Sequence, residues 1–191
     1  MSKKKIAVFA SGSGTNAEKI FQHFQNHPQA EVSLLCCNKK NAFVLERAGK
    51  FNIPTLIFNR SQFYESAEVN EQLKQAGIDL IVLAGFMWLV PEILVADFPD
   101  RIVNIHPALL PKYGGKGMYG MHVHEAVKAA GESQSGITIH LVNERYDEGA
   151  HIAQFSCDLE PSDSPSDIAG KVQKLEHENY PKVIENLVLK Y

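Results

Sequence analysis

Short apolar runs alternate with helix-forming segments over the first 105 residues, and this order constrains the fold more than any other feature. The runs are typical of buried parallel strands, and the segments between them carry apolar residues at helical spacing. The predicted strands are residues 6–10, 32–37, 55–58, 78–84 and 101–105, and the predicted helices are 17–24, 42–51, 59–76 and 91–98. This alternation predicts an α/β fold with a doubly wound, mostly parallel sheet and helices on both faces, related to the Rossmann fold.

The second half of the chain follows a different pattern. Residues 106–121 are rich in proline, glycine and lysine. The elements predicted after them are a helix at 123–130, strands at 137–142 and 151–159, and a long final helix. Ser164 and Pro165 predict the cap and first position of that helix, and Pro181 predicts a kink within it. The sequence contains no repeat, low-complexity tract or linker, so we expect a single domain over residues 1–191.

The composition argues against several classes of protein. Nineteen Lys and Arg residues against 22 Asp and Glu leave a net charge of -3, which disfavours general nucleic-acid binding. Three cysteines, Cys36, Cys37 and Cys157, are typical of a reduced cytoplasmic protein rather than a disulfide framework. No apolar stretch is long enough for an export signal or a membrane span. We therefore expect a cytoplasmic protein with no nucleic-acid or membrane partner.

Residues 11–16, called the glycine loop below, read Ser-Gly-Ser-Gly-Thr-Asn and connect the first strand to the first helix. Free backbone N–H groups at such a helix start bind phosphate, and Thr15 with Glu18 matches a capping box. A tight turn without a ligand is the alternative interpretation. The loop also matches the dinucleotide fingerprint, but no Asp or Glu follows the second strand to hold an adenosine ribose. Lys39 and Lys40 could hold a 2′-phosphate, so NADP binding remains an alternative, although the loop favours a simpler phosphate.

The segment Asn104-Ile-His106-Pro107 lies at the carboxyl end of the fifth predicted strand, where open α/β sheets place their sites. Alternation along a strand puts Asn104 and His106 on the same face, and Pro107 restricts the backbone of His106. An amide donor and an imidazole on one face suit carbonyl chemistry, because Asn stabilises an oxyanion and His moves protons near neutral pH. Without further context, such a pair is more often structural than catalytic.

A metal site is an alternative use of the histidines. His122 and His124, taken with His106 and Asp147, are side chains of the right type. However, His122 and His124 enter a predicted helix, and no cysteine cluster or His-Glu-x-x-His motif supports zinc. We therefore expect no metal.

Five motifs in a fixed order carry a resemblance to a known family. They are residues 11–16, Leu83-Ala-Gly-Phe-Met87, Asn104-Ile-His-Pro-Ala-Leu-Leu-Pro-Lys-Tyr113, Gly136-Ile-Thr-Ile-His140 and Asp147-Glu-Gly149. Together they resemble the phosphoribosylglycinamide formyltransferases (glycinamide ribonucleotide transformylases), from residue 6 to about residue 187. The resemblance implies transfer of the formyl group of 10-formyltetrahydrofolate to the amine of 5-phosphoribosylglycinamide in de novo purine biosynthesis, by direct attack through a tetrahedral intermediate.

Two related families share the Asn-x-His-Pro core. They are methionyl-tRNA formyltransferase, expected to carry an extra C-terminal domain, and formyltetrahydrofolate deformylase, expected to carry an N-terminal regulatory one. Because 191 residues do not accommodate either addition, the length favours the single-domain family.

By position, the resemblance implies that Asn104 is the oxyanion donor, His106 the proton-handling residue and Asp147 the carboxylate that stabilises protonated His106. A nearby carboxylate raises the pKa of a histidine and fixes its orientation, and His140 is expected to support this group. The residues implied to bind the ribonucleotide are Gly14, Thr15 and Asn16 for the phosphate and Glu176 for the ribose hydroxyls. A solvated helix face is the alternative interpretation of Glu176.

The folate co-substrate is implied to lie along residues 87–90 and the loop 143–147. The implied contacts are Met87, Trp88, Leu89, Val90, Asn104, Asn143, Glu144, Arg145, Tyr146 and Asp147. Trp88 departs from the family, which usually has arginine there, so Trp88 either packs near the folate or belongs to the core. Residues 114–120 are longer and richer in glycine than the commonest family form. They would suit a mobile cover, in which Lys116 meets either a ligand or solvent.

Two other functions remain open at this point. An NADP-dependent oxidoreductase would use the glycine loop, and a non-catalytic nucleotide-phosphate sensor would bind the ribonucleotide without turnover. Titration with NADPH separates the first from formyl transfer, and an assay of 10-formyltetrahydrofolate loss separates the second. The sequence leaves the oligomeric state undetermined.

Overall fold

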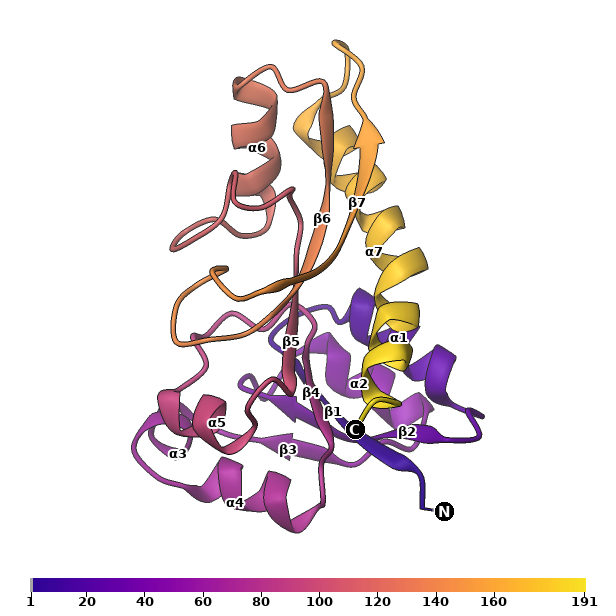
Figure 1. Ribbon diagram of the computed structural model, residues 1–191, viewed down its shortest axis with the longest axis vertical. Coiled ribbons are helices and arrows are strands. Elements are labelled where there is room, and N and C mark those ends of the chain that lie inside the picture. Colours follow the sequence, from indigo (N-terminus) through magenta and orange to yellow (C-terminus); the bar gives the residue numbers. More distant parts are fainter. Residues whose placement is uncertain (1) are drawn as a thin grey trace.

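A seven-stranded sheet organises the protein, and the structure, a computed structural model, describes residues 2–191 (Figure 1). The strands are β1 (Lys4–Ala10), β2 (Ala30–Cys37), β3 (Thr55–Ile57), β4 (Leu80–Leu83), β5 (Ile102–His106), β6 (Gln134–Leu141) and β7 (His151–Asp158). The helices are α1 (Thr15–Phe24), α2 (Phe43–Lys50), α3 (Arg60–Tyr64), α4 (Glu68–Gln75), α5 (Glu92–Asp97), α6 (Met121–Ala129) and α7 (Pro165–Val188).

The strands lie in the order β3-β2-β1-β4-β5-β6-β7. The first five are parallel, whereas β6 is antiparallel to both β5 and β7. The predicted doubly wound, mostly parallel α/β sheet is therefore confirmed. The antiparallel β6–β7 ribbon extends the sheet beyond β5. It bends away from β3 and β2, which lie at the opposite end of the strand order (Figure 1).

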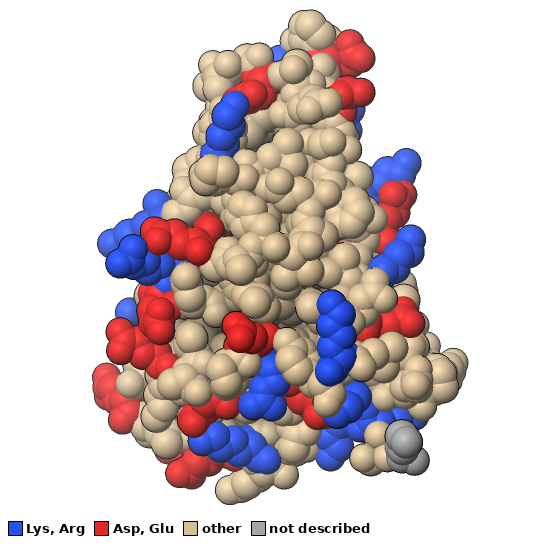
Figure 2. All heavy atoms as spheres, in the orientation of Figure 1, with Lys and Arg blue, Asp and Glu red and all other residues tan. Residues whose placement is uncertain are grey.

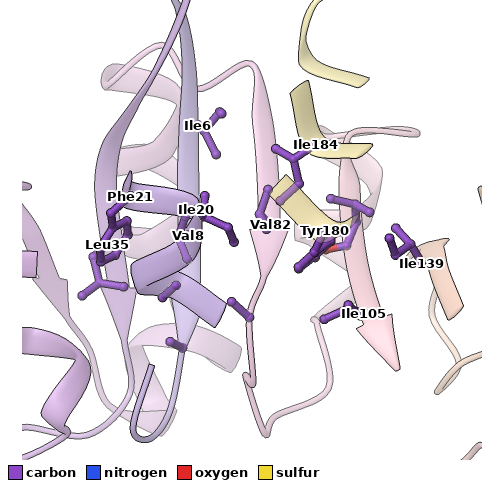
Figure 3. Close-up of a cluster of buried hydrophobic side chains, with 14 of the residues drawn as sticks. Ile6, Val8, Ile20, Phe21, Leu35, Val82, Ile105, Ile139, Tyr180 and Ile184 are labelled. Atoms are coloured by element: carbon purple, nitrogen blue, oxygen red, sulfur yellow. The ribbon is translucent and has the colours of Figure 1, made fainter. Parts of the chain in front are cut away.

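Alternating side chains along the central strands bury the sheet on both faces. In β1, Ile6 and Val8 belong to one buried cluster, and Ala7 and Phe9 belong to the other. The first cluster packs under α1, α2 and α7, and the second under α3, α4 and α5. Figure 3 shows the first cluster, with Ile6, Val8, Ile20, Phe21, Leu35, Val82, Ile105, Ile139, Tyr180 and Ile184 labelled. Helices thus cover both faces, as the alternation predicts.

The polar segment predicted as one helix at 59–76 forms two helices, α3 and α4. Asn59 caps α3 through a capping box with Gln62. Ser66 then separates the helices, because its hydroxyl donates to the Gln62 carbonyl at 3.1 Å and accepts the Glu68 N–H at 3.4 Å. A side chain that bonds nearby backbone groups competes with the helical hydrogen-bond pattern, so the single-helix prediction was wrong here.

The last helix, α7, begins as predicted. Ser164 and Asp167 form a capping box, and Pro165 occupies the first turn. The helix continues through Pro181 and ends at Val188.

Tyr180 ties α7 to the centre of the sheet. Its phenol is fully buried and donates to the carbonyl of Leu83 at 2.9 Å and to that of Val103 at 3.2 Å. A phenol has one proton, so the two carbonyls share it. The contact therefore joins β4 and β5 at the edge of the sheet where parallel strands place their ligands.

Charges of both signs are interspersed on the face of the described residues in Figure 2. Lysine and arginine side chains lie beside aspartate and glutamate there, without the continuous basic stripe that tracks a nucleic acid. Among residues 2–191, no helix combines the length and the apolar character needed to cross a membrane.

Candidate active site

A cavity of about 730 Å³ lies at the carboxyl ends of β4 and β5. The residues predicted for the site that line it are Asn16, Met87, Trp88, Leu89, Val90, Asn104, His106, Arg145, Tyr146, Asp147 and Glu176. The predicted residues that do not line it are Gly14, Thr15, Asn143 and Glu144. The fold thus brings together five parts of the chain that the sequence separates: the start of α1, the segment after β4, strand β5, the 143–147 loop, and α7.

The glycine loop turns into α1 at Gly14, which takes the N-cap position in the left-handed conformation, with φ 74°. A Cβ on Gly14 would lie 2.4 Å from Val44 Cγ2, so both the backbone angle and the space require glycine. The predicted capping box of Thr15 and Glu18 is wrong, because no side chain within residues 2–191 caps α1 and Glu18 pairs with Arg47 instead. The first N–H groups of α1 are therefore left for an anion.

Asn16 connects the glycine loop to α7. Its Nδ2 donates to Glu176 Oε2 at 2.9 Å, across 160 positions in the sequence. Burial raises the pKa of the Glu176 carboxyl, and the hydrogen bond from Asn16 opposes this only in part. The Oδ1 atom of Asn16 is buried without a hydrogen-bond partner among the described residues. A buried acceptor without a partner is costly, so this corner of the cavity suits a ligand that carries hydroxyl donors.

Asn104 is oriented by His140 on the neighbouring strand β6. The Nδ1–H of His140 donates to the Leu141 carbonyl at 2.8 Å, which leaves Nε2 as an acceptor. Asn104 Nδ2 lies 3.2 Å from this Nε2 and donates to it. This hydrogen bond determines which terminal atom of the Asn104 side chain is the nitrogen and which is the oxygen. A primary amide has two N–H groups, so the second one of Asn104 is free for a ligand in the cavity.

His106 has an oxygen acceptor at each ring nitrogen. Its Nε2–H donates to the Tyr113 carbonyl at 2.8 Å, and Nδ1 lies 3.4 Å from Asp147 Oδ2. The other Asp147 oxygen, Oδ1, lies 3.6 Å from His140 Nε2. When the ring of His106 gains a second proton, both N–H groups therefore find an acceptor.

Burial governs the ionisation of this group. It holds the pKa of His106 below its ordinary value, although the Asp147 carboxylate and the Tyr113 carbonyl favour the imidazolium. The predicted rise in the pKa of His106 is therefore wrong, because desolvation outweighs the attraction of the carboxylate. Burial also favours the neutral acid of Asp147, but a proton on the facing nitrogen of His140 or His106, together with the Gly115 N–H, lowers the pKa of that carboxyl.

An NMR titration of the His106 ring nitrogens tests this balance. We expect His106 to titrate below an ordinary histidine, and Asp147→Asn to lower its pKa further by removing a charge that favours the imidazolium. A folded-state pKa below the unfolded value means that His106 contributes stability above the unfolded pKa. This contribution is lost as the pH falls through the folded pKa. A rise in the pKa of His106 in Asp147→Asn would contradict this account.

Residues 87–90 form one wall of the cavity, and Trp88 connects it to the second buried cluster. The Trp88 ring lies 6.0 Å from the ring of Tyr64, whose hydroxyl donates to the Leu89 carbonyl at 2.8 Å. The guanidinium of Arg60 lies 5.1 Å from the Tyr64 ring and 5.9 Å from the Trp88 ring. Trp88 therefore packs against the core and lines the cavity at the same time.

Residues 115–120 also line the cavity, beside Asp147. The Gly115 N–H donates to Asp147 Oδ2 at 2.9 Å, and Lys116 is part of the cavity lining. A Cβ on Gly114 would lie 2.5 Å from Leu110 Cδ2, so a side chain there would require the Leu110 side chain to move. Segment 114–120 therefore determines part of the surroundings of the carboxylate.

The fold separates the two histidines of the metal alternative. His124 is buried, lines the cavity and has no hydrogen-bond partner at Nδ1 among the described residues. His122 is exposed and lies 3.5 Å from Glu125 within the same helix. Residues 2–191 contain no group of three or more His, Cys, Asp or Glu side chains arranged to hold a metal ion.

Comparison with known proteins decides the family. The chain matches the formyl transferase family over residues 4–184. A phosphoribosylglycinamide formyltransferase from Bacillus subtilis is 38% identical over 190 residues, covering 97% of this chain and 95% of that relative. The chain belongs to this family. A chloroplastic phosphoribosylglycinamide formyltransferase from Arabidopsis thaliana is 42% identical over 95% of this chain, which spans 64% of that longer relative.

Solved structures of the formyltransferase family share the fold. A crystal structure of phosphoribosylglycinamide formyltransferase from Bacillus halodurans has a TM-score of 0.86 at 41% identity, covering 97% of this chain and 95% of that one. Glycinamide ribonucleotide transformylase 1 from Geobacillus kaustophilus has a TM-score of 0.88 at 37% identity, covering 98% and 100% of the two chains. The resemblance carried by the five motifs is thus confirmed at the level of family and fold.

Sequence reasoning missed three residues at the site of this formyltransferase-family member. Gln173 lines the cavity three residues before Glu176 on α7, and this helical spacing is a signal that was present in the sequence. Arg60 and Tyr64, which pack on Trp88, lie in a segment that looked only polar.

Proposed function

We propose that this protein transfers the formyl group of 10-formyltetrahydrofolate to the amine of 5-phosphoribosylglycinamide, in de novo purine biosynthesis. The observation that carries the proposal is the group formed by Asn104, His140, Asp147 and His106 in one large cavity. It offers an oriented amide donor and a buried imidazole, which suit acyl transfer. The names of the relatives support the choice of donor and acceptor.

The ribonucleotide is proposed to bind between the glycine loop and α7. Its phosphate would accept from the N–H groups of Gly14, Thr15 and Asn16, where the positive end of the α1 dipole favours an anion. Glu176 would accept from the ribose hydroxyls, because a carboxylate has acceptor positions for a diol. The buried Asn16 Oδ1 that has no partner among the described residues lies on the same side and accepts a further donor.

The folate co-substrate is proposed to occupy the wall formed by residues 87–90 and the loop 143–147. The lining combines apolar side chains with half-exposed rings at Trp88 and Tyr146, which suits a flat heteroaromatic group. Of the predicted folate contacts, Asn143 and Glu144 lie outside the cavity lining, so backbone contacts from that loop are the proposal for them.

The reaction needs no nucleophile from the protein, because the amine of the ribonucleotide attacks the formyl carbon itself. In the proposed step a new C–N bond forms, and the second amide N–H of Asn104 stabilises the oxyanion. His106 helps to move the proton that the amine loses, and Asp147 stabilises the imidazolium form of His106. The C–N bond to the folate then breaks, and the folate nitrogen gains the proton that the amine loses, by way of water.

We also propose that the chain acts as one formyltransferase domain in a reducing, cytoplasmic environment. All the residues assigned above come from one sheet, the segments at its carboxyl edge and α7, which packs on one of its faces. Cys36, Cys37 and Cys157 are free thiols, which is typical of such an environment.

An absorbance assay of 10-formyltetrahydrofolate, with and without 5-phosphoribosylglycinamide, tests the function. We expect loss of the formyl donor only when the ribonucleotide is present. Loss without the amine would identify a hydrolase, and no loss in either case would exclude this acceptor. A parallel titration with NADPH is expected to give no change in protein fluorescence, and saturable binding would favour the oxidoreductase instead.

A further inference from the structure

Helix α2 packs against the glycine loop and donates hydrogen bonds to it. The Val44 N–H donates to the Gly12 carbonyl at 3.2 Å, and Arg47 Nε donates to the Ser13 carbonyl at 2.8 Å. The side chain of Val44 fills the space beside Gly14. The consecutive carbonyls of Gly12 and Ser13 are therefore both hydrogen-bonded to α2.

Arg47 is the one charged side chain in this support. Besides the Ser13 carbonyl, its guanidinium binds the carboxylate of Glu18, which lies in the first turn of α1. It also lies 4.9 Å from the ring of Phe43. The Arg47 side chain is only 17% exposed, so these contacts hold it in one orientation.

We infer that Arg47 is a positioning residue for phosphate binding by the glycine loop. An anion is attracted by N–H groups and repelled by carbonyl oxygens and carboxylates. By holding the Ser13 carbonyl and neutralising Glu18, Arg47 keeps both negative groups from opposing the phosphate. The Ser13 carbonyl and the Glu18 carboxylate already engage Nε and Nη1 of Arg47, so it acts through the loop rather than on the substrate. The inference rests on the proposed function, in which this loop binds the ribonucleotide phosphate.

Arg47→Met tests the inference because it keeps a long apolar side chain on Phe43 and removes both polar contacts. We expect the KM for the ribonucleotide to rise roughly tenfold, with kcat and the KM for the folate changed by less than about twofold. Arg47→Lys keeps the positive charge but loses the planar guanidinium that binds two acceptors at once. Its KM for the ribonucleotide should therefore lie between those of Arg47→Met and the parent.

Arg101→Met is the matched control. Arg101 also lies over a phenylalanine ring, 5.4 Å from Phe98, and donates to a backbone carbonyl, that of Asp97, at 3.4 Å. It is not part of the cavity lining. We expect Arg101→Met to leave both KM values and kcat at the parent level.

A second measurement separates failure of the inference from failure of the proposed function. Inorganic phosphate should raise the melting temperature of the parent and of Arg101→Met, and raise that of Arg47→Met less. Because the melting temperature does not depend on turnover, it tests the role of Arg47 even if the parent does not use the ribonucleotide. Failure of the parent to use the ribonucleotide would overturn only the proposed function. Equal phosphate stabilisation in all three proteins, or a fall in kcat of Arg47→Met with an unchanged ribonucleotide KM, would overturn the role of Arg47.

Discussion

Replacement of Asn104 with alanine is expected to lower kcat by about 100- to 1,000-fold, because it removes the amide donor proposed for the oxyanion. Replacement of His106 with alanine is expected to lower kcat by about 100- to 10,000-fold, because no other group at its position moves the proton. Ribonucleotide affinity should change little, since its proposed contacts lie on the glycine loop and α7. Single-turnover measurement of formyl transfer reports the chemical step directly.

The matched control for this prediction is Asn179→Ala. Asn179 is also a half-buried asparagine, but its Nδ2 donates only to the Leu175 carbonyl within α7. We expect kcat of Asn179→Ala to equal that of the parent. The Asn104→Ala/His106→Ala double variant should lose less than the product of the two single effects, because both residues act on one tetrahedral centre. A double variant with near-parent turnover would exclude the mechanism.

Replacement of Gly14 with alanine is expected to lower the free energy of unfolding by about 3 kcal/mol, because a strained backbone angle and a steric clash add. The new Cβ would lie 2.4 Å from Val44 Cγ2 and 3.0 Å from Val44 Cα, so a change of side-chain rotamer alone cannot relieve the contact. Any relief must move the glycine loop or α2. We therefore also expect a large rise in the KM for the ribonucleotide. Urea unfolding and steady-state kinetics measure the two effects.

Gly49→Ala is the control for Gly14→Ala. Gly49 lies within α2, has ordinary helical geometry and would have no atom within 4 Å of an added Cβ. Alanine there should stabilise the protein by up to about 1 kcal/mol, because alanine is the better helix former. If Gly14→Ala behaved like Gly49→Ala in both measurements, the requirement for glycine at the start of α1 would be disproved.

The fold was predictable because short-range patterns repeat with the right period. The apolar run at 78–84 contains β4, and the cap at Ser164 begins α7. The errors occurred at the ends of helices, where local hydrogen bonds and backbone conformation decide the boundary. Ser66 separates α3 from α4, and Gly14 rather than Thr15 takes the cap position of α1. Such choices depend on competing hydrogen bonds of similar strength, which residue propensities do not resolve.

The candidate site was only partly predictable for a different reason. Strand alternation predicts that Asn104 and His106 share a face, and both line the cavity. The order of strands in the sheet then decides what each side chain meets. Asn104 bonds His140, 36 positions away, because β5 pairs with β6 in this register. Nothing in the spacing of the two residues along the chain specifies that contact.

The sequence by itself determined the element order, the family through its ordered motifs, and the types of side chain available for chemistry. The tertiary structure decided which of these side chains meet, as with Asn16 and Glu176, which lie 160 positions apart. It also decided their ionisation, because burial lowers the pKa of His106 even though Asp147 is its neighbour. Hydrogen-bond partners and desolvation depend on distances in space, which the packing of the chain sets and local sequence patterns do not specify.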